Sequence, residues 1–150
     1  MDRFIKNILI IFAFILSASS FSQVCDADIN LINFDSSSIY APGSGVSIHV
    51  DPQGKFKMTD PASLGVGEDP DNNSFFLELS EAGGNFDSSV ELAAVHDFYL
   101  PLINGNLPNN ISSGQYKLRI RATAGFDNNI GDYNEVILET DFFTVSNASI

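Results

Sequence analysis

The sequence predicts an all-β protein, a β-sandwich of about seven to eight short strands. Two segments alternate strongly between apolar and polar residues, at residues 74–80 and 115–123. A period of two is typical of half-buried strands. Clusters of Gly, Pro, Asn, Asp and Ser separate these segments from further short apolar runs, and no stretch has a convincing helical period.

The amino-terminal stretch has the features of a signal peptide that is cleaved on export. Arg3 and Lys6 supply its basic start, and residues 8–16 form an apolar run that is short for a membrane span. Small residues end at Ser22, so cleavage there would leave Gln23 at the new terminus. We therefore expect a secreted or cell-surface protein with no membrane insertion after the leader is removed.

The sequence divides into three parts on this basis. Residues 1–22 are the signal peptide, residues 23–35 are an N-terminal segment with the first strand, and residues 36–150 are the sandwich domain. With 150 residues, 44% of them hydrophobic, the chain can bury one sizeable core. A single folded domain is therefore the expectation.

Cys25 is the only cysteine, so it cannot form a disulfide within the chain. It stays free, pairs with another chain, or pairs with sequence outside these 150 residues. Lipidation of this thiol is the alternative. A lipoprotein signal has a small residue immediately before its cysteine, and Val24 stands there instead.

The protein is strongly acidic, with a formal net charge of −12. Removing the leader, in which Asp2, Arg3 and Lys6 together carry +1, leaves −13 on the remainder. This charge argues against nucleic acid and anionic membranes as partners, because neither offers a positive charge to carboxylates. A divalent cation or a cationic partner fits better. Acidity also keeps an exported protein soluble.

Each expected strand is a short apolar run between turn residues. Strands or short extended pieces are expected at residues 27–34, 39–40, 46–50, 55–58, 74–80, 90–95, 98–103, 115–123, 136–140 and 142–145. Long loops are expected at residues 59–73, 104–113 and 125–135. Pro101 indicates that residues 98–103 form an edge strand or that a strand ends there, and this segment is one edge at which we expect contacts with partners. Residues 29–34 are the other edge at which we expect contacts with partners.

The strand at residues 115–123 carries Lys117, Arg119 and Arg121 on its outer face. These are three of the five basic residues that remain after leader cleavage. We therefore expect them to pair with Asp or Glu on a neighbouring strand. Tyr116 begins the inner face of this strand, where a sandwich keeps a tyrosine whose hydroxyl ties down the preceding loop.

Catalytic signals are weak. A nucleophilic triad needs a Ser or Cys, a His and an orienting carboxylate. The only histidines are His49, which alternates outward on its strand, and His96, at a strand junction, and neither lies in a nucleophile motif. Two distant histidines and one near-terminal cysteine also lack the spacing of a zinc site. We predict that the protein is not an enzyme and expect both histidines to be solvated or hydrogen-bonded.

Calcium is the one ion that the acidic loops suggest, because calcium takes carboxylate and amide oxygens. The candidate ligands are Glu68, Asp69 and Asp71 in the first loop and Asp127, Asn129 and Asp132 in the last. The second group begins like an EF-hand loop, but Gly131 stands where a ligand belongs and the twelfth place has no acid. The alternative is that all six are solvated turn residues. No other cofactor is expected.

A set of loose motifs resembles an immunoglobulin-like or fibronectin III-like module common in large secreted and surface proteins of Bacteroidetes-type bacteria. The motifs are Tyr40 to Ile48, Gly54 to Phe56, the strand and turn from Asn73 to Phe86, Ser88 to Leu92, Leu107-Pro108, and Ser113 to Arg121. The resemblance covers roughly Ser36 to Val145 and departs from the pattern in the acidic insertion at residues 59–73. It implies an adhesin, gliding-motility or type IX secretion cargo context.

The favoured function is a non-enzymatic structural or adhesion module. Such a module can be the N-terminal domain of a larger adhesin. The expected partners of the module are neighbouring domains or surface proteins. The alternative is a carbohydrate-binding or accessory domain of a secreted enzyme. That alternative needs an exposed aromatic platform for a glycan. The chain has no Trp, and Tyr99 and Tyr133 are the aromatic residues that remain for it.

Overall fold

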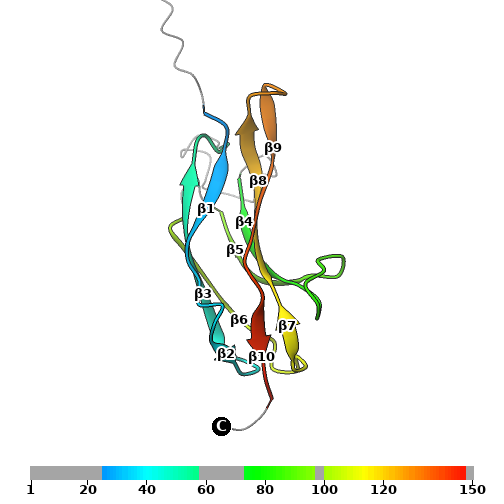
Figure 1. Cartoon of the computed structure of the whole chain (residues 1–150). Helices are drawn as coiled ribbons and strands as arrows, with labels where there is room; N and C mark the ends of the chain where they lie inside the picture. The colour runs from blue at the N-terminus through cyan, green and yellow to red at the C-terminus, as the bar shows by residue number, and fades with distance from the viewer. Residues whose placement is uncertain (1–24, 58–72, 97–99, 148–150) are drawn as a thin grey trace, which may run out of the picture.

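The computed structural model describes residues 25–57, 73–96 and 100–147, and all regular structure in these ranges is β (Figure 1). The strands are β1 (Asp28–Asn33), β2 (Ile39–Tyr40), β3 (Gly45–Gln53), β4 (Phe75–Leu79), β5 (Val90–Val95), β6 (Leu102–Asn106), β7 (Gly114–Tyr116), β8 (Leu118–Asp127), β9 (Asp132–Glu139) and β10 (Phe143–Val145). Within these ranges no helix is long and apolar enough to cross a membrane.

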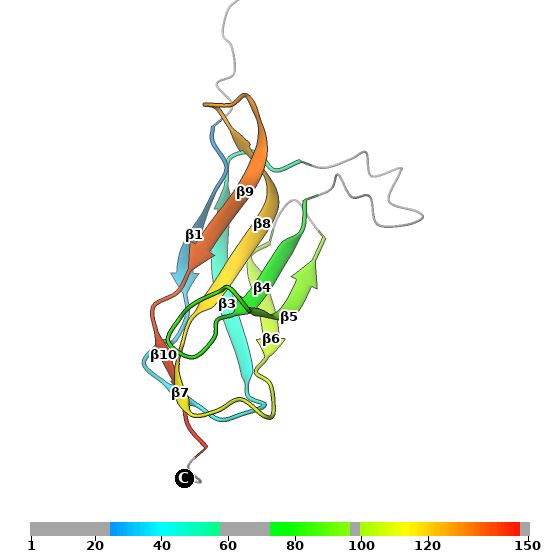
Figure 2. The same ribbon diagram turned by 90° about the vertical axis from the view of Figure 1, so that its right-hand side faces the viewer.

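The strands form three sheets that make up a sandwich-like arrangement (Figures 1 and 2). One layer has the order β1-β3-β6 and the facing layer has the order β5-β4-β8-β9. A small sheet, β2-β10-β7, closes the end of the molecule at which the C-terminus lies. All strand pairs are antiparallel except β2 with β10. The prediction of an all-β fold is confirmed.

The core lies between the two larger sheets and is built from the alternating residues that the sequence marks. The inward residues of β3, β4 and β8 are buried: Val46, Ile48, Val50, Phe75, Leu77, Leu79, Leu118, Ile120 and Ala122. Each large apolar side chain buried in this way contributes about 1.5–3 kcal/mol of transfer free energy. The same alternation puts the charged residues of β4 and β8 on the opposite, outer face.

The predicted loop at residues 125–135 is wrong. β8 continues to Asp127 and β9 begins at Asp132, so most of this segment is a β-hairpin. Its turn includes Gly131, whose φ of 67° suits glycine. A bulge between Ala122 and Gly125 shifts the alternation of β8, so the period-two pattern does not extend into the hairpin.

Of the strand predicted at residues 98–103, residues 98 and 99 lie outside the described residues, and the described strand is β6 (Leu102–Asn106), which extends into the predicted loop at residues 104–113. Gly105 explains this extension, because a Cβ there would lie 2.8 Å from Leu92 and 3.1 Å from Leu77. Glycine lets β6 approach β5 and β4 closely.

The expectation that β1 and β6 are edges is confirmed, since they flank β3. The long loop at residues 59–73 lies almost wholly outside the described residues.

Tyr116 fulfils its expected role. Its ring is buried, and its hydroxyl donates a hydrogen bond of 2.9 Å to the carbonyl of Ser112 in the preceding loop. Tyr116→Phe should therefore lower the free energy of unfolding by about 1 kcal/mol, because the carbonyl loses its partner. Urea titration measures this change, and Tyr133→Phe is the control. An equal change in both variants would contradict the assigned role of the hydrogen bond.

Candidate functional site

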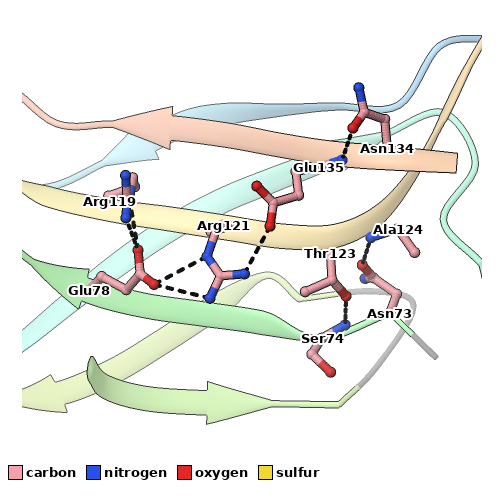
Figure 3. Close-up of polar contacts among 9 residues, drawn as sticks. All are labelled: Asn73, Ser74, Glu78, Arg119, Arg121, Thr123, Ala124, Asn134 and Glu135. Carbon is pink, nitrogen blue, oxygen red and sulfur yellow. Dashed lines mark hydrogen bonds and ion pairs between the residues drawn. The ribbon is translucent and has the colours of Figure 1, made fainter. Parts of the chain in front are cut away.

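On the outer face of the four-stranded sheet, the charges of β4, β8 and β9 alternate in sign from strand to strand (Figure 3). β4 contributes Glu78, and β8 contributes Arg119 and Arg121 beside it. β9 contributes Glu135 and Glu139 on the other side of β8. The order of the strands thus places an acidic column, a basic column and a second acidic column side by side.

Glu78 is the centre of this arrangement and is only 6% exposed. One carboxylate oxygen lies 2.6 Å from Arg119 Nη2 and accepts from its Nε at 2.7 Å. The other oxygen lies 3.1 Å from both Nη2 and Nε of Arg121. Each guanidinium therefore directs two nitrogens at one oxygen of the carboxylate, and both oxygens of Glu78 take part in charge-assisted hydrogen bonds.

The outer acidic column completes the pairing. Arg121 Nη1 lies 3.1 Å from Glu135 Oε1, and Lys117 Nζ lies 3.1 Å from Glu139 Oε2. Both glutamates are exposed, so these two pairs contribute little to stability. The expectation that the basic face of residues 115–123 pairs with acids on neighbouring strands is confirmed for all three basic residues.

Arg121 shows how the charges act on one another. Burial disfavours its charged form, but hydrogen bonds and Coulombic attraction from Glu78, and then from Glu135, outweigh that effect. The pKa of Arg121 is consequently raised above its ordinary value. The surrounding carboxylates thus favour the charged form of this guanidinium.

Aromatic rings lie among the basic side chains. The guanidinium carbon of Arg119 is 4.3 Å from the centre of the Phe86 ring, and that of Arg121 is 4.6 Å from the centre of the Phe76 ring. Lys117 Nζ lies 5.2 Å from the centre of the Phe142 ring. In these cation–π contacts each cation lies against one face of a ring.

Two hydrogen bonds, made by Asn73 and Ser74 and here called the polar clamp, hold one end of this face in place (Figure 3). Asn73, which is 1% exposed, accepts a hydrogen bond of 3.0 Å from the backbone N–H of Ala124. The backbone N–H of Ser74 donates to Thr123 Oγ1 at 3.0 Å. The clamp joins the start of β4 to the bulged part of β8, where ladder hydrogen bonding is interrupted.

The two histidines lie away from this face's ion pairs. His49 is exposed, as its outward alternation predicts. His96 is also exposed, and its Nδ1 lies 2.6 Å from the hydroxyl of Ser74. A triad also needs a carboxylate that orients the ring, and none lies against His96 among the residues that the structure describes. The pair therefore has the geometry of a surface hydrogen bond.

The calcium candidates are only partly placed. Glu68, Asp69 and Asp71 lie outside the described residues. Asp127 and Asp132 face each other across the β8–β9 hairpin, and their carboxylates accept the backbone N–H groups of Asn129 and Tyr133 at 2.7 and 2.8 Å. These carboxylates thus shape the hairpin turn. No group of three or more His, Cys, Asp or Glu suited to a metal occurs within residues 25–57, 73–96 and 100–147. The calcium assignment stays a prediction.

Tyr133 is one of the two aromatic residues that the glycan-binding alternative depends on, and its side chain packs within the β8–β9 hairpin. Its ring meets that of Phe126 edge to face, with ring centres 5.6 Å apart. The ammonium groups of Lys55 and Lys57 lie 5.5 and 5.9 Å from the centre of the Tyr133 ring. Tyr99 lies outside the described residues.

The sequence does not reveal the central role of Glu78. The available signal is a single acid at an outward position of the segment at residues 74–80, whose other residues are apolar or serine. Its two partners depend on which strand lies next to β4, and this is a tertiary fact. Comparisons of the chain with protein families, curated proteins and solved structures found no match.

Proposed function

We propose that this chain is an exported immunoglobulin-like module with a structural or adhesive role and no enzymatic activity. The immunoglobulin-like assignment is supported by the strand order. Labelled A to G along the chain, β5-β4-β8-β9 corresponds to the order C′-C-F-G of a variable-type immunoglobulin sheet, and β1 and β3 to strands A and B. Tyr116, which ties down the loop before it, occupies the position of the tyrosine corner in that fold.

The observation that carries the functional proposal is the course of the chain between the two ends of the sandwich (Figures 1 and 2). At one end, the backbone N–H of Ala27 donates to the carbonyl of Phe126 in the β8–β9 hairpin at 2.8 Å. At the other end, the N–H of Ser146 donates to the carbonyl of Tyr40 at 2.9 Å. Each end of the described chain is thus tied to a different end of the molecule, which suits a rigid spacer contacted from both ends.

The charge and the sheet edges support an interacting role. The remainder of the chain after leader removal carries −13, and the edge strands β1 and β6 each pair with β3 alone among the described strands. Such edges accept neighbouring domains or surface proteins by strand pairing. The glycan-binding alternative is weaker, because Phe76 and Phe86 are covered by guanidinium groups and Tyr133 packs against Phe126.

Competition with the purified mature protein tests this proposal. Added to cells of the native host, it should reduce their attachment to a surface in a dose-dependent manner, because it occupies the same partners without linking them to the cell. Heat-unfolded protein is the control. An increase in polymer degradation with no effect on attachment would favour the enzyme-accessory alternative.

A further inference from the structure

The outer edge of β9 is a second surface at which the sandwich can take a partner. β9 is the last strand in the order β5-β4-β8-β9, so among the described strands it pairs only with β8. The N–H of Thr140 donates to the carbonyl of Leu118. This bond shows which residues of β9 direct their backbone groups toward β8. Backbone groups then alternate along β9, and those of Glu135, Ile137 and Glu139 point away from β8.

The first half of this edge is capped by its own side chains. The N–H of Tyr133 donates to the side-chain oxygen of Asp132 at 2.8 Å. The N–H of Glu135 donates in the same way to Asn134 at 2.8 Å (Figure 3). Ile29, on the neighbouring edge strand β1, is capped in the same way by Asp28. Such caps compete with pairing to another strand.

The second half of the edge cannot be capped in this way. The residues before Ile137 and Glu139 are Val136 and Leu138, whose side chains hold no acceptor. Ile137 is 49% exposed, and Leu31 and Ile32 on β1 are exposed as well. A groove of about 330 Å³ lies between the start of β1 and β9, and Asp26, Glu135 and Ile137 are among the residues that line it. The open part of the edge is therefore residues 136–139.

The charge columns determine what can pair there. From β4 through β8 to β9 the columns are acidic, basic and acidic, so a strand added beside β9 would find an acidic neighbour. A second copy of β9 fits poorly. Antiparallel pairing about Ile137 would place Glu135 opposite Glu139 of the other copy, and like charges in that position repel.

We propose that the β9 edge binds an extended segment of another protein by strand addition, and that this segment carries a basic, an apolar and a basic residue at alternate positions. The apolar residue meets Ile137, and the basic residues meet Glu135 and Glu139. The proposal rests on the proposed function, which it deepens by giving the chemistry of the partner.

A labelled synthetic peptide of about nine residues, with Lys-Thr-Ile-Thr-Lys at its centre, tests this proposal against mature protein. The control is the same peptide with Glu in place of both Lys residues. The Lys peptide should bind at least about tenfold more tightly than this control, because it forms two complementary charge pairs where the control forms two repulsive ones. The difference should shrink as salt is added. Equal affinity for the two peptides, or no binding of the basic one at millimolar protein, would overturn the proposal.

Two variants and one mapping experiment locate the site. Ile137→Pro removes an outward N–H without removing a bond to β8, so it should weaken binding by about tenfold. Glu139→Lys should weaken it further, whereas Glu91→Lys on β5, at the opposite edge of the same sheet, should not. Thermal melting checks that each variant is folded. Hydrogen exchange should show new protection at Ile137 and Glu139 on binding, and protection at β6 instead would contradict the assigned site.

The peptide test and the cell tests can fail separately. If the peptide does not bind but purified protein still competes for attachment, the partner chemistry is wrong and the adhesive role stands. If the peptide binds and attachment is unaffected, the strand-addition site stands without the adhesive role. Self-association of the wild-type protein through β9 would contradict the charge argument itself.

Discussion

Glu78→Ala is expected to lower the free energy of unfolding by about 3 kcal/mol, because it leaves Arg119 and Arg121 largely buried without their common partner. Glu78 is 6% exposed and receives contacts from both guanidinium groups at 2.6 to 3.1 Å. Removing one partner of a buried ion pair costs more than the pair's net worth, since the remaining charges stay desolvated. Urea unfolding of the purified protein measures the loss.

The matched control is Glu135→Gln, which removes an acid that pairs with the same Arg121 from an exposed position. We expect a loss of less than about 1 kcal/mol in this variant. Similar losses for Glu78→Ala and Glu135→Gln would mean that Glu78 does not hold the two arginines, and that the charged face is a set of ordinary surface pairs.

Phe143→Ala is expected to cost about 3–5 kcal/mol, since it opens a cavity at the small sheet. The Phe143 ring is fully buried and contacts the rings of Phe34, Tyr40 and Tyr116, with ring centres 5.6, 5.3 and 6.3 Å apart. These contacts join β10 to β2 and β7, so the change should loosen the end of the sandwich at which the chain leaves it.

The neighbouring residue supplies the control for this change. Phe142 is 46% exposed, so Phe142→Ala should cost less than about 1 kcal/mol. Thermal melting and urea titration of the pair measure the difference. A loss at Phe142 equal to that at Phe143 would contradict the assignment of Phe143 to the core and of Phe142, just before β10, to the surface.

The parts of the fold that the sequence predicts are those in which alternation and burial agree. Leu77 and Ile120 lie in segments of strong alternation, and both are buried on adjacent strands. The basic residues at Lys117, Arg119 and Arg121 could be placed on one outer face for the same reason. The hydrogen bond from the Tyr116 hydroxyl to the preceding loop is predictable too, because Tyr116 lies two residues after Gly114 at the start of the most regular strand.

The parts that could not be predicted depend on contacts between distant segments. The bulge in β8 ends its alternation near Ala122, so the hairpin with β9 is hidden in a stretch rich in Asp, Asn and Gly. The local sequence predicts that Gly105 lies in a loop. The close approach of its backbone to Leu77 and Leu92 is a contact between distant segments that the local sequence does not show. The double pairing of Glu78 and the open edge of β9 likewise depend on strand order, which local patterns do not encode.

Deletion of residues 27–145 in the native host, with the leader and any downstream sequence kept, tests the central claim most directly. If the sandwich works by presenting surfaces to partners, attachment or surface display should fall while polymer degradation stays unchanged. A selective loss of degradation with normal attachment would contradict this account and favour the accessory domain of a secreted enzyme.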